Sequence, residues 1–171
     1  MINFLANLGR QPVAWVLLFL SALTLEIAAL YFQYVLELRP CIMCIYQRTA
    51  VFGILFSACL PLISNNILTR LLAYIGVGVS AVWGLVIALE HVEIQTAKSL
   101  FAICEIVPNF PTWAPLHEWM PSIFAATGDC GDINWSFVGM SMPQWMIVIF
   151  AIYTGVLALV IMSKMINKKA R

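Results

Sequence analysis

Four long apolar runs dominate the chain, and polar residues gather between them. A helix needs about 20 apolar residues to cross a bilayer, and the four runs come close to that length. They predict membrane spans over about residues 13–34, 42–63, 71–90 and 145–163. Segment 91–143, before the last span, is the one extramembrane stretch of any size. The pattern therefore predicts an all-α membrane protein, with residues 1–171 forming a single four-transmembrane-helix bundle with one long loop.

Composition agrees with a chain surrounded by a lipid bilayer. Of the 171 residues, 63% are hydrophobic and 10% are charged, whereas about a quarter of the residues of an average soluble domain are charged. The formal net charge of +1 indicates no nucleic-acid partner, because proteins that bind nucleic acid carry a basic excess.

The basic residues predict the orientation of the chain in the membrane. Four spans place both termini on one side, and most basic residues lie there: Arg10, Arg70, Lys164, Lys168, Lys169 and Arg171. Since basic residues are enriched on the cytoplasmic side, we expect cytoplasmic termini and an outward-facing loop. Four of the five cysteines then lie at or beyond the outer face, where disulfides persist.

Part of the loop carries apolar residues at nearly helical spacing. These are Trp113, Leu116, Met120, Ile123 and Phe124, with Trp119 beside them. Such spacing is typical of a helix lying in the membrane interface, so we expect a short interfacial helix in the loop. The alternative is an ordinary packed loop, since several prolines limit regular structure to short pieces.

A Cys-x-x-Cys pair opens the second apolar run. Pro40 fits the first turn of a helix, which places Cys41 and Cys44 about one turn apart, at a separation compatible with a disulfide. A helix N-terminus favours the thiolate, and Arg48 adds a positive charge on the same face. The pair predicts redox chemistry. A zinc half-site or two structural cysteines are the alternatives, and a cation such as Arg48 disfavours the metal.

Four further residues could take part in chemistry, and the sequence alone does not settle their roles. Cys104 and Cys130 lie 26 positions apart in the loop, where a disulfide would be either labile, and so open to thiolate attack, or a structural staple. Glu26 lies inside the first span, as a proton relay or as a neutral or hydrogen-bonded structural group. Cys59 lies near the opposite end of its span and is expected to be an inert buried thiol.

Two cysteine pairs on one face suggest an exchange relay that must hand electrons to an acceptor. Ile45 follows Cys44, which excludes a Cys-x-x-Cys-His haem signature, and the chain has no Gly-rich dinucleotide motif. A membrane-dissolved acceptor remains, and a quinone is the common one. Arg48 would stabilise charge on a quinone oxygen. His91 would hydrogen-bond or donate a proton, or alternatively cap the third span at the interface.

The chain resembles the DsbB family of bacterial inner-membrane disulfide-generating proteins over nearly its whole length. The resemblance rests on Pro40-Cys41-x-x-Cys44 with Arg48, the Glu90-His91 pair, Cys104, Phe124-x-x-x-Gly128-Asp129-Cys130, and Met142-Pro143-Gln144-Trp145. It implies a quinone reductase that reoxidises a periplasmic, thioredoxin-fold oxidant of the DsbA type. It also implies an inner-membrane location, a periplasmic loop, and ubiquinone or menaquinone as the cofactor.

The resemblance further implies roles for individual residues. Cys104 is expected to form the mixed disulfide with the partner, and Cys130 is expected to be its pair. Cys44 is expected to engage the quinone while Cys41 exchanges with the loop cysteines. The quinone-proximal positions of the family match Arg48 and His91, and Met142 and Trp145 are expected to border the same pocket.

Three other functions are compatible with parts of the sequence. A relative with the same chemistry would serve one dedicated partner. A metal-handling membrane protein would use Cys41, Cys44, His91 and Cys104 for Zn²⁺ or Cu(I), although the spans lack the buried polar rows of an ion path. A purely structural subunit would leave two outward cysteine pairs without a purpose.

Overall fold

Four long helices form the body of the molecule. The computed structural model describes residues 9, 11–96 and 108–169. Within these ranges the long helices are α2 (Pro12–Tyr34), α3 (Ile42–Ile63), α4 (Ile67–Thr96) and α7 (Met142–Lys169). Each of the four contains an apolar stretch long enough to cross a membrane. The predicted all-α bundle with four membrane-spanning helices is confirmed.

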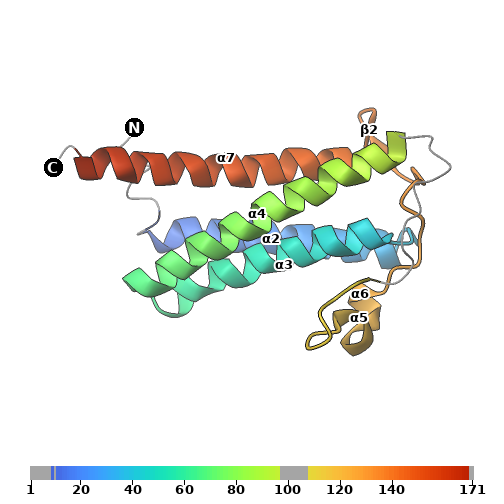
Figure 1. Ribbon diagram of the computed structural model, residues 1–171, viewed down its shortest axis with the longest axis horizontal. Helices are drawn as coiled ribbons and strands as arrows, with labels where there is room; N and C mark the ends of the chain where they lie inside the picture. The colour runs from blue at the N-terminus through green and yellow to red at the C-terminus, as the bar shows by residue number, and fades with distance from the viewer. Residues whose placement is uncertain (1–8, 10, 97–107, 170–171) are drawn as a thin grey trace.

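The helices lie side by side in alternating directions (Figure 1). Helix α3 packs against α2 and α4, and α4 packs in turn against α7. The start of α2 and the end of α7 lie at the same end of the bundle, and the loop segments lie at the other end (Figure 1). We call this second end the loop end.

The outer surface of the bundle is apolar. Leu17, Ile63 and Ile67 have exposed fractions of 63%, 84% and 82%. Water would penalise this exposure, whereas lipid hydrocarbon solvates such side chains well. The protein is therefore a multi-pass membrane protein, in which the apolar runs face the lipid.

Alanines, larger aliphatic side chains and one aromatic ring make the centre of the bundle. The main buried cluster contains four alanines and the fully buried Phe150, together with Val51, Ile54, Leu55 and Val77. A Cβ added to Gly84 of α4 would overlap the Phe150 ring of α7. Small residues let membrane helices approach closely, and Gly84 provides the space that the ring of Phe150 occupies.

Helix α4 is longer than the apolar stretch within it. It has 30 residues, which corresponds to a length of about 45 Å. At its start, the Asn66 side chain accepts a hydrogen bond from the Thr69 backbone N–H at 2.9 Å, as an N-cap residue does. At the loop end the helix continues to Thr96, so Glu90 and His91 lie within it rather than just after it.

The described part of the loop contains two single helical turns and a hairpin. The expected interfacial helix is divided into α5 (Leu116–Trp119) and α6 (Pro121–Phe124), because Pro121 has no N–H to continue the first turn. Strands β1 (Ser136–Phe137) and β2 (Met140–Ser141) pair as a hairpin with register Ser136↔Ser141. Its turn residues Val138 and Gly139 both have positive φ, 52° and 75°, as a type I′ turn requires.

Replacing Gly84 by alanine tests the close contact between α4 and α7. We expect Gly84→Ala to destabilise the bundle by about 1–3 kcal/mol, because the added methyl group overpacks the core against Phe150. Thermal unfolding in detergent, followed by circular dichroism, measures the effect. Gly155→Ala in α7 is the control, since nothing lies within 4 Å of its added Cβ. Equal melting temperatures for the two variants would contradict the packing role of Gly84.

Candidate functional site

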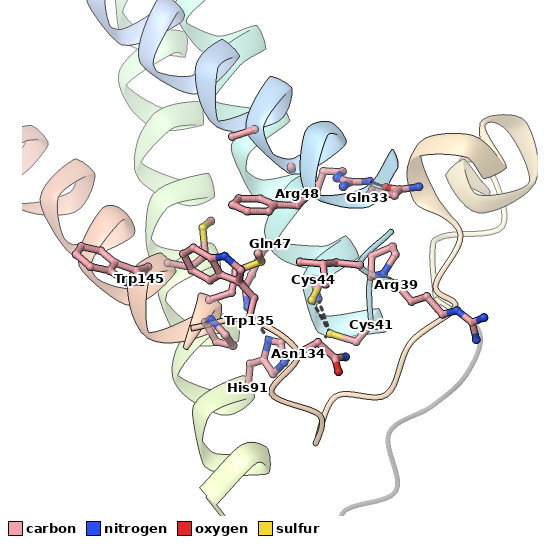
Figure 2. A pocket seen from close by; sticks show the side chains of 18 of the residues that line it. Gln33, Arg39, Cys41, Cys44, Gln47, Arg48, His91, Asn134, Trp135 and Trp145 are labelled. Carbon is pink, nitrogen blue, oxygen red and sulfur yellow. Dashed lines mark hydrogen bonds between the residues drawn. The ribbon is translucent and has the colours of Figure 1, made fainter. Parts of the chain in front are cut away.

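A cavity lies at the loop end of the bundle and is bordered by all four long helices. Its volume is about 300 Å³, at the lower end of the range for small-molecule pockets. Most of its wall is apolar, with polar side chains gathered near the start of α3 (Figure 2). The lining includes Glu26, Gln33, Cys41, Cys44, Gln47, Arg48, His91, Asp129, Asp132, Trp135, Met142 and Trp145.

The start of α3 fixes the geometry of the cysteine pair. Cys41 is the N-cap residue of α3, and its sulfur accepts a hydrogen bond from the Cys44 backbone N–H at 3.2 Å. The two sulfur atoms are 2.7 Å apart (Figure 2). Pro40 lies one residue before the N-cap instead of in the first turn, where the sequence placed it. Cys41 takes the cap because its sulfur satisfies a backbone N–H that has no partner within the helix.

The two sulfurs differ in exposure and in protonation. Cys41 is 2% exposed, while Cys44 is only partly buried. The hydrogen bond to Cys44, together with burial, raises the pKa of the Cys41 thiol well above its usual range. Cys41 therefore holds its proton and shares it with the sulfur of Cys44. Cys44 is the sulfur of the pair that is better placed to act as a nucleophile towards the cavity.

A buried histidine and a buried glutamine complete this side of the site. His91 Nε2 lies 3.5 Å from the Cys41 sulfur, and His91 Nδ1 lies 3.1 Å from the Gln47 side-chain nitrogen. His91 and Gln47 are 2% and 4% exposed. The helices α3 and α4 bring these residues together, since they pack along their lengths in opposite directions.

Arg48 lies on the opposite side of the cysteine pair and is held by neutral groups. Its guanidinium donates to the Gln33 side-chain oxygen at 2.8 Å and to the Ile123 carbonyl at 2.5 Å. The nearest carboxylate oxygen of Glu26 is 4.0 Å from Arg48 Nε. Among the described residues, neither Glu26 oxygen has a hydrogen-bond partner. A hydrogen-bonded structural role for Glu26 is therefore not what this structure shows.

The loop places Cys130 against the start of α3. The Pro40 carbonyl accepts hydrogen bonds from the backbone N–H groups of Thr127 and Gly128, at 2.9 and 3.0 Å. The next residues bring the fully buried Cys130 into one cluster with Cys41 and Ile42. Hydrogen bonds to a backbone carbonyl thus bring the cysteine of the loop next to the cysteine pair of the bundle.

The described cysteines fall into two oxidation states. Cys41, Cys44 and Cys59 are free, and Cys130 is disulfide-bonded. Cys104, the expected partner of Cys130, lies outside the described residues. Cys59 was expected to be buried but is only partly buried, and it does not line the cavity.

Cys41, Cys44 and His91 are also candidate metal ligands, since their ligand atoms lie within 4.8 Å of one another. Two thiolates on one tetrahedral zinc are roughly 3.8 Å apart, given Zn–S bonds of about 2.3 Å. The 2.7 Å between the two sulfurs is shorter than that spacing, so the pair in this arrangement does not have the geometry of two zinc ligands.

Several lining residues were not assigned by sequence reasoning. Gln33 and Gln47 contact Arg48 and His91 directly, and Trp135 lines the cavity from the loop. Both glutamines could have been recognised in the sequence as polar residues inside apolar spans, because a buried side-chain amide requires a hydrogen-bond partner. Met142 and Trp145 line the cavity as expected.

A buried dithiol at a cavity between membrane-spanning helices defines a membrane-embedded thiol–disulfide oxidoreductase. The family model described as "Disulfide bond formation protein DsbB" matches residues 11–160. The chain belongs to this family, as its motifs indicated.

Individual relatives agree over almost the full length of the chain. A "Disulfide bond formation protein B" from Pseudoalteromonas atlantica is 58% identical over 98% of this chain and 99% of the relative. Proteins with the same name from Pseudoalteromonas translucida and Psychromonas ingrahamii are 51% and 47% identical, again over 98% of this chain and over 99% and 91% of the relatives.

Gly128 offers a test of how the loop is held. An added Cβ would overlap the Arg39 carbonyl oxygen, so we expect Gly128→Ala to displace the loop and uncover Cys41. The rate of Cys41 alkylation should rise severalfold, as measured by mass spectrometry of the full-length protein. Gly131→Ala is the control, because its added Cβ meets only the Asp129 side chain, at 3.2 Å. An unchanged alkylation rate in Gly128→Ala would contradict this role of the loop.

Proposed function

We propose that the protein oxidises a periplasmic thioredoxin-fold dithiol of the DsbA type and passes the electrons to a membrane quinone. The observation that carries this proposal is the position of Cys44. Its sulfur lies 2.7 Å from that of Cys41, at the wall of a largely apolar cavity of about 300 Å³ bordered by membrane-spanning helices. A lipid-soluble acceptor can occupy such a cavity beside the sulfur that is to be oxidised.

The first part of the reaction is exchange between the partner and the loop. Cys130 is in a disulfide, and the resemblance to the family implies Cys104 as its partner. A thiolate of the partner attacks Cys104, and Cys130 leaves as a thiolate. The second thiolate of the partner then releases Cys104. Two electrons and two protons move from the partner dithiol to the loop dithiol.

The second part is exchange between the loop and the start of α3. A loop thiolate attacks Cys41 of the oxidised pair, and Cys44 leaves as a thiolate. The second loop thiolate then attacks the loop sulfur that is bonded to Cys41, so that Cys41 leaves and the loop disulfide forms again. Cys130 packs against Cys41 in one buried cluster, which supports Cys41 as the atom attacked. The products are an oxidised loop and the reduced Cys41–Cys44 dithiol, the form in which the pair is seen here.

The last part is oxidation of the dithiol at the cavity. A quinone, when bound, accepts two electrons and two protons and becomes a quinol while the Cys41–Cys44 disulfide forms. Arg48 supplies a fixed positive charge near Cys44 that favours negative charge on the thiolate and on an acceptor oxygen. His91 supplies a ring nitrogen beside Cys41. Ubiquinone and menaquinone share the paired ring carbonyls that these groups would recognise.

The cellular arrangement follows from the same proposal. The bundle lies in a bacterial inner membrane with cytoplasmic termini, and residues 91–143 face the periplasm. The distribution of basic residues supports this orientation. So does the clustering of Cys41, Cys44 and Cys130 at the loop end, since disulfides are maintained outside the cytoplasm.

Quinone absorbance tests the proposal. We expect a short-chain quinone to be reduced when purified protein is mixed with a reduced DsbA-type partner, with two partner thiols lost for each quinone reduced. Cys44→Ser should lower the rate to that of the mixture without protein, because Ser cannot form the disulfide. Cys59→Ser, the control, should react at the normal rate, since Cys59 lies away from the cavity.

Two outcomes would redirect the assignment. Normal turnover by Cys44→Ser would sink the electron route through this pair. If no quinone is consumed with any partner, and the purified protein contains one equivalent of zinc or copper, the metal-handling alternative replaces the redox one. Trapping with Cys130→Ser, followed by identification of the bound protein, distinguishes a general oxidant from a dedicated partner.

A further inference from the structure

Three buried side chains form a chain of hydrogen bonds that ends at Cys44. The Gln47 side-chain nitrogen lies 3.1 Å from His91 Nδ1, His91 Nε2 lies 3.5 Å from the Cys41 sulfur, and the Cys41 sulfur lies 2.7 Å from that of Cys44. Figure 2 shows these residues at the same side of the cavity. The function proposed above uses Cys41, Cys44 and His91 but gives Gln47 no task.

The hydrogen bond between Gln47 and His91 determines which group donates in the hydrogen bonds that follow it. The amide nitrogen of a glutamine only donates hydrogen bonds, and a neutral imidazole has one donor nitrogen and one acceptor nitrogen. Because Gln47 donates to Nδ1, Nδ1 is the acceptor and Nε2 carries the hydrogen. The Nε2–H group faces the Cys41 sulfur, and the His91 ring also forms a hydrogen bond with the backbone of Cys130.

We propose that Gln47 is a positioning residue that fixes the tautomer of His91 and thereby makes His91 a hydrogen-bond donor to Cys41. All hydrogen bonds then point one way, from Gln47 through His91 and Cys41 to Cys44. The inference rests on the proposed function, in which Cys44 is the sulfur that reacts at the cavity.

The direction matters because Cys41 has one hydrogen to give. When its sulfur accepts from His91 Nε2–H and from the Cys44 backbone N–H at 3.2 Å, its own S–H is directed to the Cys44 sulfur. Negative charge on Cys44 is then stabilised by a chain of aligned donors, which polarise one another in a buried site. With the opposite tautomer, bare Nε2 would accept the S–H of Cys41, and the thiolate of Cys44 would lose that hydrogen bond.

The Nε2–H group of His91 also acts in the last step of the proposed reaction, the formation of the Cys41–Cys44 disulfide. When Cys41 and Cys44 form their disulfide, Cys41 must give up its proton and attack the Cys44 sulfur. The Nε2–H group stabilises the negative charge on Cys41 at that moment. Two S–H groups are replaced by one disulfide bond, and the acceptor takes the two electrons and the two protons that are released.

The protonation of Cys44 also depends on the other charged and titratable groups around it. These are Arg48 on the same helix, Cys41 at its cap, His91 on α4, Glu26 on α2, and Arg39, Asp129 and Asp132 on the connecting segments that line the cavity. Variants of Gln47 keep all of these groups, so a change in the reactivity of Cys44 reports on the hydrogen-bond chain.

Nitrogen NMR of the histidine ring tests the tautomer directly. The chain contains two histidines, so ¹⁵N-histidine labelling of full-length His117→Gln protein, reduced and free of quinone, leaves His91 as the single signal. We expect a protonated Nε2 and a bare Nδ1. Gln47→Glu replaces the donor by an acceptor of the same shape, so the hydrogen should move to Nδ1. A protonated Nδ1 in the protein with Gln47, or no change in Gln47→Glu, would overturn the proposal.

Alkylation of Cys44 tests the consequence. In Gln47→Glu we expect the pH midpoint of Cys44 alkylation to rise by about one pH unit, which is about a tenfold lower rate at a fixed pH below the midpoint. Gln47→Met separates the lost donor from the added charge, because Met is neutral and of similar length. It should raise the midpoint in the same direction, by less. Cys59, a free thiol on the same helix, serves as the internal reference for access of the reagent.

The outcomes distinguish this proposal from the proposed function. An unchanged midpoint in both Gln47 variants would overturn the hydrogen-bond chain even if quinone is reduced normally. The expected tautomer and midpoint shifts without any quinone reduction would support the chain and reject the quinone. Both variants are measured after folding is checked by thermal unfolding, and Gln47→Glu also keeps the size of the buried side chain.

Discussion

The site depends on the cap of one helix. Cys41 stands where α3 begins, and its sulfur satisfies a backbone N–H of the first turn. This single contact sets the backbone of the Cys-x-x-Cys segment and brings the two sulfurs to 2.7 Å. It also leaves the carbonyl of Pro40 free to hold the loop. The start of α3 therefore positions both the cysteine pair and the loop that packs against it.

Around this point several buried polar side chains gather at the loop end of an otherwise apolar bundle. Arg48 is satisfied by the neutral oxygens of Gln33 and Ile123 rather than by a close carboxylate. Neutral partners leave the positive charge of the guanidinium uncompensated, so its field acts on the neighbouring sulfur and cavity. A tight ion pair with Glu26 would have cancelled much of that field at this depth.

The bundle could be predicted from sequence because apolar runs of membrane length have one main structural solution. The pair at Cys41 and Cys44 and the charge at Arg48 were recognisable because their spacing is local. His91 came from the resemblance and from its place at the end of a run. Contacts between helices depend on axial offset and rotation, which no local pattern encodes, so the partnership of Gln47 with His91 was not predicted.

The loop likewise shows what can and cannot be predicted from sequence. The spacing from Trp113 to Phe124 indicated a helix, and the residues do form helical turns. The division at Pro121 follows from its missing N–H, and the sequence predicts that prolines limit this segment to short helical pieces. The docking of Gly128 on the backbone near Pro40 was not, because it joins segments almost 90 positions apart through carbonyl and N–H groups that every residue possesses.

The length and inclination of α4 affect the position of His91 in the site. The helix measures about 45 Å, whereas the hydrocarbon core of a bilayer is about 30 Å thick. Its apolar run, about residues 71–90, already matches that thickness, so the remaining length of the helix extends past the hydrocarbon at its ends. The helix crosses its neighbours obliquely (Figure 1), and His91 lies near one of these ends, where a change of inclination moves a residue furthest. The angle at which α4 packs on α3 therefore governs the distance between His91 and Cys41.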